Sequence, residues 1–72
     1  MKDNFILFAT EMMMAQPPTS RKLYYELLHE YINKKSDDAF QELKVFVDVA
    51  IPDFDNQFNL YLNAINEKTN QI

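Results

Sequence analysis

The chain has one histidine, His29, and a glutamate stands three residues before it. The pair Glu26-x-x-His29 has the spacing that helical bundles use to hold a pair of metal ions. Such a site needs a second pair and further inward carboxylates, and one histidine does not suffice. On a helical wheel both side chains lie opposite Tyr24, Leu27 and Tyr31, which is typical of a solvated face. We therefore expect no metal site.

Nucleophilic catalysis finds no better support. His29 would have to activate Ser20 or Ser36, and no spacing places either within hydrogen-bond reach. No carboxylate stands in a pattern that indicates burial beside an apolar wall, the setting that tunes an acid or base. The chain has no cysteine, which excludes thiolate chemistry, and no glycine, which excludes phosphate-binding loops. We expect neither an enzyme nor a bound cofactor.

The composition indicates one small domain, spanning residues 1–72, with a surface that binds another molecule. Hydrophobic residues make up 47% of the chain, including six Phe and four Tyr. A body of this size has a thin core, so part of this apolar surface is expected at an interface. The absence of cysteine suits a reducing, cytoplasmic setting. No stretch approaches the roughly 18 apolar residues of a membrane span, so no membrane partner is expected.

Residues that interrupt the helical spacing of apolar residues divide the chain into four segments. They predict an all-α fold, namely a compact four-helix domain with short connections. Pro17-Pro18 and Pro52 each end one helix and admit the next. Between them, Lys34-Lys35-Ser36-Asp37-Asp38 combines cations that suit a helix end, a capping residue, and anions that suit a helix start. The predicted helices span about 3–15, 19–34, 37–51 and 53–68, followed by a frayed tail over 69–72.

The third of these segments is open to two interpretations. Val45-Phe46-Val47-Asp48-Val49 is rich in strand formers, whereas Ala39, Phe40, Leu43 and their neighbours follow helical spacing. A lone strand would find no partner in this chain. Asp38 followed by Gln41 also resembles a capping box. A helix is therefore expected here.

The first segment is apolar around most of its circumference, since only Asp3, Asn4, Thr10 and Glu11 interrupt it. Such a helix is either central to the fold or covered by a partner. Its methionines suit gap filling in a core as well as an adaptable surface. We predict that it contributes apolar residues to a partner-binding patch or a homodimer seam, namely Phe5, Phe8, Met12 and Met13.

Charge is divided unevenly along the chain. Residues 1–36 hold five Lys or Arg and four Asp or Glu, giving +1, while residues 37–72 hold two and seven, giving −5, which sum to the net −4. An acidic surface attracts basic protein surfaces. The expected function is a small protein-binding regulator, adaptor or inhibitor that also uses acidic partner-binding residues, namely Asp37, Asp38, Glu42 and Asp48.

A nucleic-acid-binding regulator is the alternative, because two helices with a short link resemble a helix-turn-helix. Its binding would depend chiefly on Arg21, Lys22, Lys34 and Lys35. The third segment, however, offers mostly carboxylates where base and phosphate readers are mostly Arg, Lys, Asn and Gln. Nucleic acid is therefore an unfavourable partner.

Overall fold

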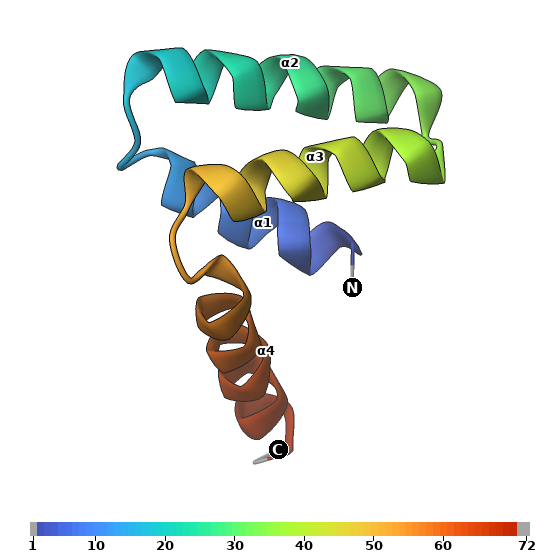
Figure 1. Ribbon diagram of the computed structural model, residues 1–72. Coiled ribbons are helices and arrows are strands. Elements are labelled where there is room, and N and C mark those ends of the chain that lie inside the picture. Colours follow the sequence, from blue (N-terminus) through green and yellow to red (C-terminus); the bar gives the residue numbers. More distant parts are fainter. Residues whose placement is uncertain (1, 71–72) are drawn as a thin grey trace.

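The computed structural model describes residues 2–70, with side chains through residue 66. Over this range the chain forms four helices and no strand, which confirms the predicted fold class (Figure 1). The helices are α1 (Lys2–Met13), α2 (Pro18–Lys34), α3 (Asp37–Ala50) and α4 (Phe54–Asn70). None of these described helices is both long enough and apolar enough to cross a membrane.

The two prolines after α1 set the first connection. α1 ends at Met13, before the predicted boundary at residue 15, and the chain then closes into tight turns. In the first of them the Met14 N–H donates to the Glu11 carbonyl at 3.2 Å. α2 begins with Pro18 in its first turn. Proline lacks a backbone N–H, but an N–H at this position would have no hydrogen-bond partner within the helix. The proline pair therefore separates the two helices as predicted.

The second connection is closed by local hydrogen bonds. The backbone N–H of Lys35, which has a φ of 50°, donates to the Tyr31 carbonyl at 2.7 Å and caps α2. The Ser36 hydroxyl accepts from the Ala39 N–H at 3.1 Å and caps α3. The capping box predicted at Asp38 is therefore wrong, because the helix already begins at residue 37.

The segment that contains Val45–Val49 is helix throughout. Leu43 and Val47 lie one turn apart and are both completely buried, so a helix places them together in the core. α3 ends where Ile51 adopts an extended conformation, as the residue before a proline prefers. α4 continues to Asn70, past the predicted end at 68, and the rest of the predicted tail, 71–72, lies outside the described residues.

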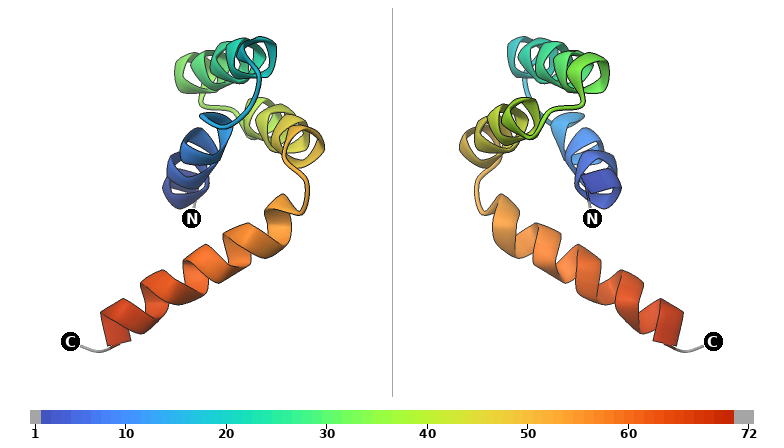
Figure 2. Two further views of the ribbon diagram at one scale, coloured as in Figure 1. Left: turned by 90° about the vertical axis from the view of Figure 1, so that its left-hand side faces the viewer. Right: turned by 90° about the vertical axis from the view of Figure 1, so that its right-hand side faces the viewer.

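α1 packs against one side of the side-by-side pair α2 and α3 (Figures 1 and 2). Tyr24 of α2 is wholly buried, and its hydroxyl is within 2.8 Å of the Thr10 hydroxyl and 3.4 Å of the Ile6 carbonyl of α1. The buried Tyr24 hydroxyl therefore has hydrogen-bond partners inside the core. The buried cluster comprises Phe5, Ala9, Met13, Tyr24, Leu43, Val47, Ile51 and Phe54.

Two of the residues predicted for a partner-binding patch belong to this core. Phe5 is 3% exposed and Met13 is 0% exposed. Together with Ala9 they form the inner stripe of α1, at the four-residue spacing that keeps side chains on one helix face. The prediction that Phe5 and Met13 lie on a binding surface is corrected, because the other helices already cover them.

α4 packs against α1 through aromatic rings. Phe54 and Phe58 lie edge-to-face to Phe5 at centroid distances of 5.4 and 5.6 Å, and Tyr61 stacks on Phe8 at 4.7 Å. Beyond these contacts the helix extends away from the other helices (Figure 2). Only the first half of α4 therefore shares the common core.

Candidate protein-binding surface

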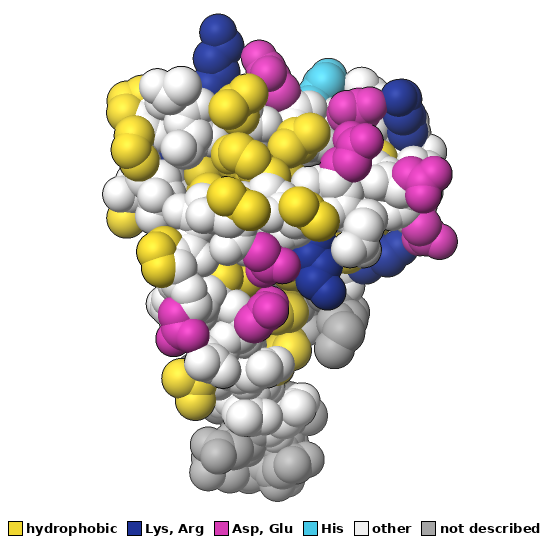
Figure 3. Space-filling view, viewed as in Figure 1, with side chains coloured by type: hydrophobic (Ala, Val, Ile, Leu, Met, Phe, Trp, Pro, Cys, Tyr) yellow, Lys and Arg dark blue, Asp and Glu magenta, His cyan; other side chains and the backbone are white. Residues whose placement is uncertain are grey.

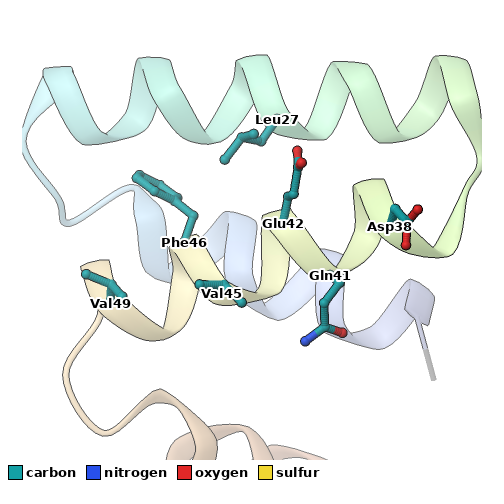
Figure 4. Close-up of a pocket in the computed structure, with 7 residues that line it drawn as sticks. All are labelled: Leu27, Asp38, Gln41, Glu42, Val45, Phe46 and Val49. Atoms are coloured by element: carbon teal, nitrogen blue, oxygen red, sulfur yellow. The ribbon is translucent and has the colours of Figure 1, made fainter.

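A hollow lies along the outer side of the α2–α3 pair, with a volume of about 800 Å³. We call it the α2–α3 groove. Figure 4 shows Leu27 reaching down from α2 toward Phe46 and Glu42 on α3. The groove is lined by Leu27, Asp38, Gln41, Glu42, Val45, Phe46 and Val49.

Two valines of this groove are open to solvent. Val45 is 52% exposed and Val49 is 80% exposed, while Leu27 and Phe46 are half-buried. Single apolar side chains on a surface are ordinary, but several gathered in one hollow indicate an interaction site. Figure 3 shows apolar side chains gathered over this face, with carboxylates beside them. This face is therefore the strongest candidate for binding.

The strand-like composition of α3 produces this surface. Leu43 and Val47 fill the core, so Val45 and Val49 fall on other sides of the same helix. A run with apolar residues at nearly every position cannot bury all of them against the neighbouring helices. Excess apolar surface therefore emerges on α3 as well as on α1, where sequence reasoning placed it and where Leu7 is exposed.

Acidic groups dominate the end of the groove near the α2–α3 connection. Asp38 and Glu42 line it, and Glu30 of α2 accepts a hydrogen bond from the Lys34 ammonium at 2.8 Å. That bond, together with the nearby carboxylates Glu30 and Glu42, raises the pKa of Lys34. Asp38 and Glu42 are the charged residues that line the groove, so its lining carries a net charge of −2. The potential here favours a cationic partner.

The other predicted partner residues are spread over different surfaces. Phe8 and Met12 are half-buried and pack against the core, and the Phe8 ring also contacts Phe54 and Tyr61 of α4. Asp37 is exposed and pairs with Lys2 at 2.7 Å; the hydrogen bond from Lys2 lowers the pKa of Asp37. Asp48 does not line the groove. The structure thus brings together Asp38 and Glu42, and joins to them apolar residues that sequence reasoning did not select.

A second hollow, of about 580 Å³, lies between α4 and the helices α1 and α3. Phe5, Phe40, Phe58 and Leu62 form its apolar part, and its charged lining residues are Lys2, Lys44 and Asp55. Lys2 is paired with Asp37 at 2.7 Å, so the cations and carboxylates around this hollow balance and give little preference for a partner of either sign. The α2–α3 groove therefore has the clearer charge preference of the two hollows.

The pair that resembled a metal motif lies on the opposite side of α2 from Tyr24. Glu26 and His29 are both exposed, as the wheel predicted. Their side chains point toward solvent, whereas the ligands of a bundle metal site point inward.

Asp48 gives the protein a small pH dependence of stability. Partial desolvation, and then the nearby Asp55 carboxylate, raise the pKa of Asp48 above its ordinary value. An acid whose pKa is raised by folding destabilises the fold when ionised, and this cost fades as the pH falls below that pKa. We expect Asp48→Asn to stabilise the protein at pH 7 by about 0.2–0.5 kcal/mol, the scale of like-charged neighbours on a helix surface.

The measurement is urea unfolding of Asp48→Asn and wild type at pH 7 and at pH 3. The gain should vanish at pH 3, where both forms of residue 48 are uncharged. Asp55→Asn should give part of the same gain, and the double variant less than the sum of the two. A gain that persists unchanged at pH 3 would contradict the electrostatic cause.

No protein-family model, curated protein or solved structure matches this chain.

Proposed function

We propose that this protein is a small regulator or inhibitor that acts by binding a basic surface of another protein through the α2–α3 groove. The observation that supports this most is the hollow itself, which is lined by exposed Val45 and Val49 and by half-buried Leu27 and Phe46. A partner that covers these side chains gains hydrophobic free energy in proportion to the area removed from water.

Charge supports a basic protein as the partner. Asp38 and Glu42 at the rim attract cations, and the chain carries a net charge of −4. Complementary charge raises the association rate and disfavours wrong partners, while the apolar floor supplies most of the affinity. The same carboxylates repel a phosphate backbone, which makes the nucleic-acid alternative less favourable.

The test is affinity capture from native lysate with the groove altered. In Val45→Ser/Val49→Ser two apolar side chains become small and polar without any change of charge. Covering two valines contributes about 3 kcal/mol, so the partner should bind on the order of a hundredfold more weakly. The matched control is Leu60→Ser on α4, because Leu60 is 69% exposed and lies outside the groove.

The expected result is a basic protein that wild type and Leu60→Ser retain and that the double variant loses. Its retention should also weaken as salt is raised, because salt screens the rim charges. Circular dichroism would verify that all three proteins are folded. If the double variant captures the same proteins as wild type, the groove is not the binding site. Retention on heparin with no effect of the groove variant would favour the nucleic-acid alternative.

A further inference from the structure

The α2–α3 pair presents two long sides, and one of them already holds a helix. α1 lies along the inner side and inserts Phe5, Ala9 and Met13 at four-residue spacing (Figures 1 and 2). The outer side is the α2–α3 groove, with Leu27 and Phe46 at its base. Both sides are formed by the same two helices, whose ridges accept a third helix in the same manner. Resting on the proposed function, we propose that the groove binds a basic amphipathic helix of the partner protein.

The dimensions of the groove fit a short helix. Asp38 and Val49 mark its two ends on α3 and lie about 16 Å apart at about 1.5 Å per residue. A helix of about three turns covers that length. Residues 2–70 contain no strand, so this part of the chain offers no sheet edge to which an extended peptide could add. Packing of an amphipathic helix into the groove is therefore favoured over strand addition.

Charge defines the chemistry of this helix. Its apolar stripe, at spacings of three and four residues, covers Val45, Phe46 and Val49. Its flanks carry Lys or Arg, because the charged residues that line the groove, Asp38 and Glu42, are both carboxylates and give it a net charge of −2. A second copy of this chain is a poorer occupant, since each copy carries a net charge of −4.

The probe is a synthetic peptide of about 18 leucine and lysine residues with its leucines on one helical face. One control peptide has the same composition in shuffled order, and a second replaces lysine with glutamate. Binding is measured by fluorescence anisotropy, and the site is mapped by amide chemical shifts in NMR. We expect the leucine–lysine peptide to bind and to shift the amides of Leu27 and of residues 45–49.

Matched protein variants separate packing from charge. Val45→Ser/Val49→Ser should weaken binding of the leucine–lysine peptide on the order of a hundredfold, and Leu60→Ser should leave it unchanged. Asp38→Asn/Glu42→Gln should weaken it about tenfold and reduce its salt dependence. Both control peptides should bind at least about tenfold more weakly than the probe.

Several results would overturn the proposal. One is equal binding of the shuffled or the glutamate peptide, and another is unchanged binding to the Val45→Ser/Val49→Ser variant. A third is sedimentation of wild type as a dimer that this variant dissociates, because the groove would then hold a second copy. If the probe peptide does not bind while capture from lysate still depends on the groove, the helical occupant is wrong and the proposed function stands.

Discussion

Met13→Glu is expected to unfold the protein, whereas Met14→Glu leaves it folded. Met13 is 0% exposed and its neighbour Met14 is 69% exposed. A carboxylate at position 13 would be buried among apolar side chains with no partner, at a cost on the order of 5 kcal/mol. A domain of this length has a total stability of roughly 4–11 kcal/mol, so this one change removes much or all of it.

Urea unfolding followed by circular dichroism measures this difference. Met14→Glu places the same charge at the same end of α1, so it controls for the helix dipole, which costs about 0.3–1 kcal/mol there. The buried carboxyl would also have a raised pKa, so Met13→Glu should regain stability as the pH falls. Similar unfolding curves for the two variants at pH 7 would place Met13 outside the core.

Phe5→Ala is expected to have the second-largest effect. The Phe5 ring is 3% exposed and makes edge-to-face contacts with Phe40, Phe54 and Phe58 at centroid distances of 5.3, 5.4 and 5.6 Å. It therefore joins α1 to both α3 and α4. Truncating a buried phenylalanine costs about 3–5 kcal/mol, through lost burial and the cavity that remains. We expect the contact with α4 to weaken first.

Hydrogen exchange of the α4 amides, combined with urea unfolding, measures this effect. In Phe5→Ala at low denaturant, amides of α4 should lose protection before those of α2 and α3. Leu7→Ala is the matched control on the same helix, because Leu7 is 61% exposed and its truncation should cost less than about 0.5 kcal/mol. Equal losses in the two variants would contradict the central position of Phe5.

The helices could be predicted because their signals are local. Pro17, Pro18 and Pro52 restrict their own backbone and that of the residue before each, whatever the rest of the chain does. Ser36 caps α3 through a hydrogen bond to a residue three positions away. The less certain segment, Val45–Val49, was resolved by tertiary contacts, since burial of Leu43 and Val47 on one face outweighs a preference for strand.

The candidate site was harder to predict because a pattern of apolar residues does not reveal which of them are covered. α1 and α3 both carry more apolar residues than one helix face can hold. Which of these surplus apolar residues reach solvent depends on how the neighbouring helices are arranged. Since α1 lies between α4 and the α2–α3 pair, Phe5 and Met13 are enclosed. Since the outer side of α3 has no described helix against it, Val45 and Val49 remain exposed.

The sequence by itself determined the number of helices, their approximate ends and the acidic character of the second half, because each depends on residue type and short-range spacing. Tertiary structure alone decided that Met13 belongs to the core, that Asp38 and Glu42 border an apolar hollow, and that Asp37 pairs with Lys2 instead. These properties depend on which helices become neighbours in space. Several packings of four amphipathic helices satisfy the same local pattern, and the sum of many weak contacts selects one of them.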